Sequence, residues 1–184
     1  MANKLIGSVG LAPGTDTGFD LDTKGQLHSY TSTQYALDVG NDSDILVCDS
    51  GEASGLKYTA NTTSFVLACS DETTAISDTG TKLTFYMPFD YTVVSVRASL
   101  TTTSSSGTPI IDISEDDTSI MTTTKITIDA GDLLSTDSAT QPVLTDTALA
   151  DEAKITIDVD VTGTDATGLK CYIIGYRVAH WVKM

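Results

Sequence analysis

The chain has 184 residues with 25 acidic and 10 basic side chains, and its formal net charge is −15. Phosphate binding depends on clustered Lys and Arg, so this balance excludes nucleic acid as a partner and disfavours anionic membranes. Thr and Asp are abundant, and no block shows apolar residues three and four positions apart. We therefore expect an all-β chain, either one domain or a smaller domain plus an extension, and we prefer the second.

Residues 1–80 are predicted to form an N-terminal arm that contacts a partner. The arm is rich in Gly, Asp, Ser and Thr, and turn signals separate its short apolar pieces. Residues 34–39 and 44–48 are expected to pair as a β-hairpin across a Gly-Asn-Asp-Ser turn. An isolated hairpin is marginally stable in water, so this one should lie against another surface, either the C-terminal domain or a neighbouring subunit.

Residues 81–184 are predicted to form an antiparallel β-sandwich of jelly-roll type. Seven strands are expected, over residues 82–89, 91–101, 109–114, 118–121, 125–129, 152–162 and 167–178. The long span 130–151 shows no clear period and is expected to cross between the two sheets.

The clearest strand pattern covers residues 154–161. Ile155, Ile157, Val159 and Val161 alternate with Thr156, Asp158, Asp160 and Thr162, as in a strand with one buried face. The predicted core consists of Leu83, Phe85, Met87, Phe89, Val94, Val96, Ala98, Ile111, Ile113, Ile126, Ile128, Ile155, Ile157, Val159, Leu169, Cys171 and Ile173. Cys171 falls within this set, so we expect a buried thiol rather than a nucleophile.

The cysteines suggest a reducing compartment. Cys48, Cys69 and Cys171 are far apart in sequence and form no C-x-x-C pair, which indicates neither a disulfide framework nor a zinc site. The N-terminal residues do not have the pattern of a signal peptide. We expect synthesis in a cytosol and no cofactor.

Catalysis has few candidate residues, and we expect the chain not to be an enzyme. His28 and His180 are the only side chains that ordinarily titrate near neutral pH, and neither lies in a known catalytic motif. Asp158 and Asp160 share one strand face at roughly 7 Å. Their repulsion requires water, a bound cation or a lysine from an adjacent strand, for which the candidates are Lys125, Lys154 and Lys170.

Two groups of acids could supply oxygens to Ca²⁺. They are Asp16, Asp20 and Asp22, and Glu115, Asp116 and Asp117. Neither group has the spacing of a calcium-binding loop with its distal Glu. We favour solvated loop acids in both places.

The C-terminal tail carries the one tryptophan, Trp181. A large apolar ring in a terminal tail is expected to be covered, either by its own sandwich or by another chain. Both alternatives stay open, and we include Trp181 among the candidate partner contacts.

Several stretches resemble a domain found in virion proteins of tailed bacteriophages, particularly marine and cyanobacterial ones. The longest is Thr84-Phe-Tyr-Met-Pro-Phe-Asp-Tyr-Thr-Val-Val-Ser-Val-Arg-Ala-Ser99, and the others are 110–113, 118–120, 125–129, 149–152, 155–160, 168–170 and 175–177. Residues 25–30, 37–40, 45–49 and 55–58 are similar to a short repeat unit of phage tail and surface proteins. The resemblance implies a non-enzymatic accessory virion subunit, trimeric, made in the host cytoplasm.

Two locations on the virion agree with the resemblance. Our first choice is a decoration or cement protein on the capsid surface, whose arm contacts the major capsid protein or neighbouring virion subunits. The candidate contacts are Phe19, Leu21, Leu27, Tyr30, Tyr35 and Trp181. The alternative is a tail fibre or adaptor module that binds a host surface glycan or protein through the loops 101–107 or 130–151. An exported carbohydrate-binding module ranks third.

Overall fold

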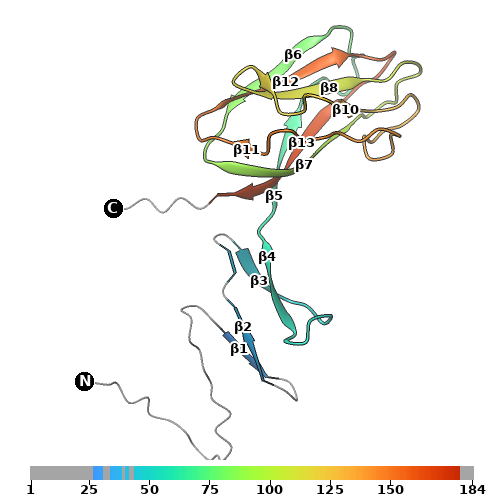
Figure 1. Ribbon diagram of the computed structural model, residues 1–184. Helices are drawn as coiled ribbons and strands as arrows, with labels where there is room; N and C mark the ends of the chain where they lie inside the picture. The colour runs from blue at the N-terminus through green and yellow to red at the C-terminus, as the bar shows by residue number, and fades with distance from the viewer. Residues whose placement is uncertain (1–26, 31–33, 39, 42–43, 179–184) are drawn as a thin grey trace, which may run out of the picture. The chain divides into compact units, whose positions relative to one another are not determined.

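The structure is a computed structural model, and it describes residues 27–30, 34–38, 40–41 and 44–178 (Figure 1). Every regular element among these residues is a β-strand. The chain divides into two compact units, Met1–Asn41 with Leu46–Thr59, and Asp42–Ile45 with Ala60–Met184. The predicted all-β class is therefore confirmed.

The described residues up to Ala60 form two strand pairs, and most of the residues in these pairs belong to the first unit. Strands β1 (Leu27–Tyr30) and β2 (Gln34–Leu37) pair with each other, and β3 (Asp44–Cys48) pairs with β4 (Leu56–Ala60). The predicted hairpin between residues 34–39 and 44–48 is therefore wrong. Residues 49–55 connect β3 to β4 as a loop, in which Asp49 accepts a hydrogen bond from the Gly51 N–H and forms a salt bridge with Lys57. This loop returns the chain beside β3, so β3 pairs with the strand that follows it.

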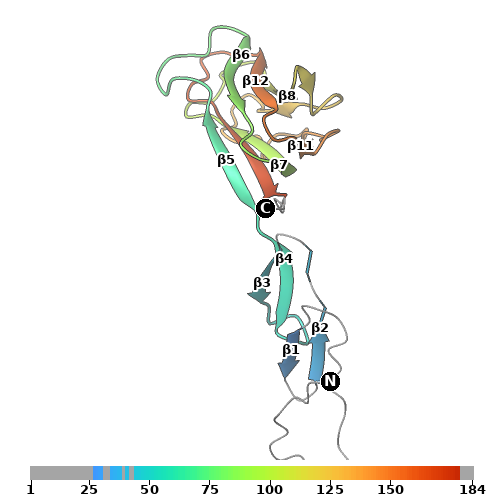
Figure 2. The same ribbon diagram turned by 90° about the vertical axis from the view of Figure 1, so that its left-hand side faces the viewer.

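The second unit is a sandwich of two antiparallel sheets (Figures 1 and 2). One sheet has the order β11-β7-β13-β5, and the other has the order β10-β8-β12-β6, with β9 beside β8. Their bounds are β5 Thr63–Ala68, β6 Gly80–Tyr86, β7 Tyr91–Ser99, β8 Ile110–Glu115, β9 Thr118–Ser119, β10 Ile126–Thr127, β11 Ala148–Leu149, β12 Lys154–Val161 and β13 Lys170–Arg177. With β9 set aside, the eight strands have the order of a jelly roll.

The core lies between these sheets and follows the period of two. Ile155, Ile157 and Val159 of β12 are buried, whereas Thr156 and Asp158 between them are half-buried. The prediction that Val161 shares the buried face is wrong: its side chain is 40% exposed, because the β12–β8 register shifts between Val159 and Val161. From the facing sheet Val96, Ala98, Cys171 and Ile173 are buried, as are the predicted Met87, Ile111, Ile113, Ile126, Ile128 and Leu169. Leu83, Phe85 and Phe89 are partly buried against this core. Most of the predicted core is thus confirmed.

Val94 is the exception, because its side chain is 55% exposed. The β7–β13 register passes from Ser95 opposite Ile174 to Val93 opposite Gly175, so Val94 is one extra residue at a β-bulge. A bulge shifts the inward positions by one residue. Val93 and Val96 consequently both face the core, and Val94 faces outward.

Two further features concern the ends of the sandwich. The predicted crossing of residues 130–151 is confirmed, because β10 lies in one sheet and β11 pairs with β7 in the other. Strand β5 pairs with β13, so part of the predicted arm, residues 1–80, lies in the sandwich. The second compact unit resumes at Ala60.

Candidate functional site

The predicted partner contacts lie mostly outside the described part of the chain. Phe19, Leu21 and Trp181 fall outside it. Leu27 and Tyr30 lie in β1 and Tyr35 lies in β2, where only the backbone is described. These contacts stay predictions.

The described residues of the first unit form no buried core of their own. Between Leu37 and Ala60, none of the residues whose burial is described is buried. Leu46 of β3 is 40% exposed. Two-stranded sheets are marginally stable in water, so these strand pairs gain stability from a covering surface.

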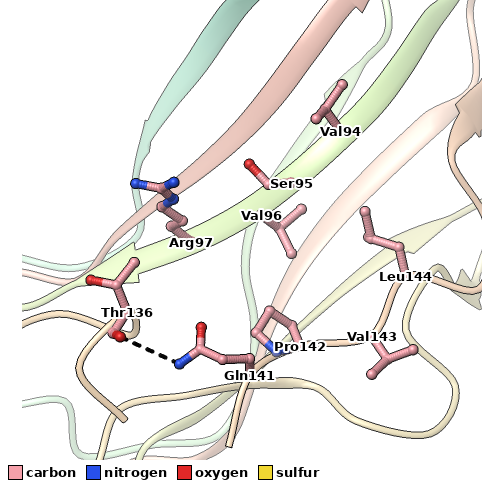
Figure 3. Close-up of a pocket in the computed structure, with 9 residues that line it drawn as sticks. All are labelled: Val94, Ser95, Val96, Arg97, Thr136, Gln141, Pro142, Val143 and Leu144. Atoms are coloured by element: carbon pink, nitrogen blue, oxygen red, sulfur yellow. Dashed lines mark hydrogen bonds between the residues drawn. The ribbon is translucent and has the colours of Figure 1, made fainter.

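A second feature is a pocket beside β7, with a volume of about 470 Å³. Residues 94–97 of β7 form one wall and residues 141–144 of the loop before β11 form the other (Figure 3). A smaller hollow continues from Arg97 to Leu134, Tyr172 and Ile174. We call the two together the Arg97 pocket.

The pocket exists because β7 lacks a continuous neighbour on this side. The Val93 N–H donates to the Thr147 carbonyl at 2.7 Å, and farther along the Ser135 N–H donates to the Ala98 carbonyl at 2.9 Å. Between these points the loop runs away from β7, because the Val143 N–H donates at 2.9 Å to the carbonyl of Thr124, a residue that precedes β10. The wall of residues 141–144 is thereby held apart from residues 94–97.

Ser135 holds the loop at the end of the pocket. Its side chain is 1% exposed, and its Oγ accepts a hydrogen bond from the Ala98 N–H at 2.9 Å. We expect Ser135→Ala to lower the free energy of unfolding by about 1–2 kcal/mol, since the Ala98 N–H loses its partner in a buried position. Urea denaturation measures this, and Ser105→Ala, at an exposed serine, serves as the control. Equal stability of both variants would contradict the role of Ser135.

The charges around the pocket differ from those of the chain as a whole. No Asp or Glu lines the Arg97 pocket. Each lysine in the described part of the chain forms a salt bridge, and the Arg177 guanidinium lies 4.8 Å from the centre of the Phe89 ring. Arg97 is exposed and, among the described residues, has no carboxylate partner.

The outer face of the other sheet is acidic and internally paired. Lys125 Nζ lies 2.8 Å from Asp112 Oδ2 and 2.6 Å from Asp160 Oδ2. Asp158 accepts hydrogen bonds from the hydroxyls of Thr81 and Thr156. Lys125 therefore supplies the cation that the sequence requires near Asp160.

The other two predicted lysines bind elsewhere. Lys154 forms a salt bridge with Asp117, and Lys170 forms one with Glu72.

The acids considered for Ca²⁺ have structural partners where they are described. Glu115 accepts the Ala150 N–H at 2.7 Å, and Asp116 accepts the Lys154 N–H at 3.0 Å. Asp16, Asp20 and Asp22 lie outside the described residues. Within the described ranges, no three His, Cys, Asp or Glu side chains are grouped so that they could hold a metal ion.

The three thiols differ in accessibility. Cys48 is exposed, whereas Cys69 and Cys171 are buried. A hydrogen bond with Cys69, together with burial, raises the pKa of the Cys171 thiol well above its ordinary value. Thiolates are the reactive form, so Cys171 is chemically protected.

We expect a thiol reagent to label the exposed Cys48 rapidly in the folded protein, and to label the buried Cys69 and Cys171 only after unfolding. Mass spectrometry of labelled peptides measures the rates. Rapid labelling of Cys171 under native conditions would contradict the burial of this side chain.

Neither histidine adds a described catalytic group, because only the backbone of His28 is described and His180 lies outside the described residues. No helix long and apolar enough to span a membrane occurs in the described ranges.

Comparisons with models of protein families, with curated proteins and with solved structures find no match.

The sequence did not indicate the Arg97 pocket. Its walls are about 45 positions apart in the chain and meet only through the pairing of β7 with the loop. The available signal was Arg97 itself, a cation within a strand of a strongly acidic chain.

Proposed function

We propose that this chain is a non-enzymatic accessory subunit of a phage virion, which binds the assembled capsid surface and stabilises it. One observation supports a binding role above the others. The jelly-roll unit has a complete core, whereas no residue of the first unit whose burial is described is buried. Strand pairs of this kind suit a role in which they lie on a partner surface.

The mechanism is stabilisation by mass action. A subunit that binds the assembled shell but not its separated parts lowers the free energy of the shell. In this proposal the chain is a homotrimer made in the host cytoplasm, and its partners are the major capsid protein or neighbouring virion subunits. The net charge of −15 would keep densely displayed copies soluble.

Deletion of residues 1–35 tests the proposal, because it removes β1, the first part of β2 and the predicted contacts Phe19, Leu21, Leu27, Tyr30 and Tyr35. We expect the shortened chain to fold and to lose binding to purified virions of the phage that encodes it. Cosedimentation with virions measures the binding. Deletion of residues 179–184 is the control for Trp181. If the chain without residues 1–35 still coated virions, the arm would not carry the binding.

A tail-associated module that binds a host surface glycan or protein is the second candidate. The Arg97 pocket favours it, because residues 141–144 of the predicted binding loop form one wall and Tyr172 offers an aromatic ring. Copy number separates the two functions. Decoration requires hundreds of copies per virion, and a tail part requires a handful.

A further inference from the structure

The edge of β7 is open along the Arg97 pocket. The structure gives edge-side backbone bonds for Val93 and Ala98, and none for the residues between them among those it describes. Residues 94–97 therefore offer an edge about 13 Å long, at the usual rise of a strand. Open edges can be extended by a strand from another segment, which adds main-chain hydrogen bonds.

The two sides of this open edge have different chemistry. Val96 is 3% exposed and Leu144 is packed against the core, so the inner side is apolar. Arg97 is exposed, and in Figure 3 it points to the opposite side of β7 from Val96. A strand added here places alternate side chains on the two sides. The matching segment has apolar residues at every second position and carboxylates between them.

A carboxylate on the outer side has a specific partner. Arg97 lacks a carboxylate partner among the described residues, and no acid lines the Arg97 pocket. A guanidinium forms strong charge-assisted hydrogen bonds with a carboxylate, and its planar fork favours this geometry. The pocket therefore selects an acidic and apolar strand over a neutral one.

The chain itself contains such a segment, outside the described residues. Phe19-Asp20-Leu21-Asp22 alternates apolar and acidic side chains over four positions, which equals the length of the open edge. We infer that Phe19–Asp22 of a neighbouring copy adds to the edge of β7, with Asp20 and Asp22 beside Arg97 and with Phe19 and Leu21 beside Val96 and Leu144. The assignment to a neighbouring copy rests on the proposed function, in which the arm contacts other subunits.

Charge exchange in the full-length chain tests this inference. Sedimentation velocity over a range of concentrations, under reducing conditions, measures self-association. Arg97→Glu, and separately the pair Asp20→Arg with Asp22→Arg, should each raise the concentration needed for association by about tenfold or more. Combining all three changes should restore association, because the opposite charges meet again with their signs reversed.

Lys154→Glu is the control, since it changes the net charge as Arg97→Glu does but lies on the other sheet. The inference is supported if each charge change weakens self-association, if the combination restores it and if the Lys154→Glu control leaves it unchanged. A monomeric wild type, unchanged association in the Arg97 variant, or failure of the combination to rescue would overturn it. Virion binding is measured on the same samples. A monomer that still coats virions would refute the inference and the trimeric state, and it would leave the proposed binding to the capsid surface standing.

Discussion

Replacing Lys125 by Met is expected to lower the free energy of unfolding by about 2–3 kcal/mol. Asp112, which pairs with Lys125, is 6% exposed, so its carboxylate depends on that ammonium group. Removing one partner of a buried ion pair usually costs about 3–5 kcal/mol. We expect less, because Asp112 keeps hydrogen bonds from the Ile113 N–H and the Ser119 hydroxyl, and Lys125 is itself 32% exposed.

Urea denaturation of three variants separates the ion pair from simple loss of packing. Asp112→Asn in the Lys125→Met background should recover part of the lost stability, because Asn accepts the same two hydrogen bonds without a charge. Lys154→Met is the matched control. Its partner Asp117 is 78% exposed, and removing such a surface pair should cost at most about 1 kcal/mol. Equal losses for the two lysine variants would contradict the importance of Asp112 burial.

The ion pair of Lys125 with Asp112 makes the free energy of unfolding depend on pH in the alkaline range. Hydrogen bonds to Asp112 and Asp160 raise the pKa of Lys125 above its ordinary value of 10.5. A raised lysine pKa stabilises the folded state fully below the unfolded-state pKa, and this stabilisation is lost as pH rises through the folded-state pKa. The stability difference between wild type and Lys125→Met should therefore stay constant from about pH 7 to pH 10 and narrow above about 10.5.

The strands were predictable where one face is buried without interruption. Ile155, Ile157 and Val159 alternate with polar residues, and a one-residue slip would have placed all three in water. The sandwich class follows from several such strands with turn residues between them. These local patterns predict the fold, because burial of one face fixes the register of each strand.

Strand partners and register shifts were not predictable in the same way. The sequence 34–48 is compatible with a hairpin, but β2 pairs with the preceding β1, and β3 pairs with the following β4. Local turn signals exist on both sides of each strand, so they do not decide the partner. Val94 was placed in the core because a Val-Val pair fits either phase of the alternation. Gly175 on the opposite strand was the overlooked signal, since glycine within a strand often marks a bulge.

The candidate site was the least predictable part. The Arg97 pocket depends on the bulge at Val94, on the anchoring of the loop by Ser135, and on the hydrogen bond from Val143 to Thr124. Each of these contacts joins residues far apart in sequence. The pocket therefore follows from tertiary pairing, and the sequence of β7 offers only Arg97 as a signal of it.

Gly175→Ala is expected to be the most destabilising single methyl addition in the sandwich, with a loss of at least about 3 kcal/mol. Gly175 is buried in β13 opposite Val93, next to the bulge. A Cβ atom at this position would lie 1.9 Å from the Thr92 carbonyl oxygen and 2.8 Å from the Tyr91 ring. The backbone oxygen has no room to move unless β7 separates from β13. Such a separation would also displace Val94 and Arg97 from the wall of the Arg97 pocket.

Gly131→Ala is the control for this variant. Gly131 has a φ of 93° with nothing within 4 Å of an added Cβ, so the change meets only the backbone cost of about 1–2 kcal/mol. Urea denaturation of both variants separates steric overlap from backbone strain. The loss of unfolding free energy in Gly175→Ala should exceed the loss in Gly131→Ala. If Gly175→Ala proved as stable as Gly131→Ala, the close approach of β13 to β7 would be wrong. Self-association of Gly175→Ala, measured where it is still folded, should also fall, because the open edge of β7 begins beside this glycine.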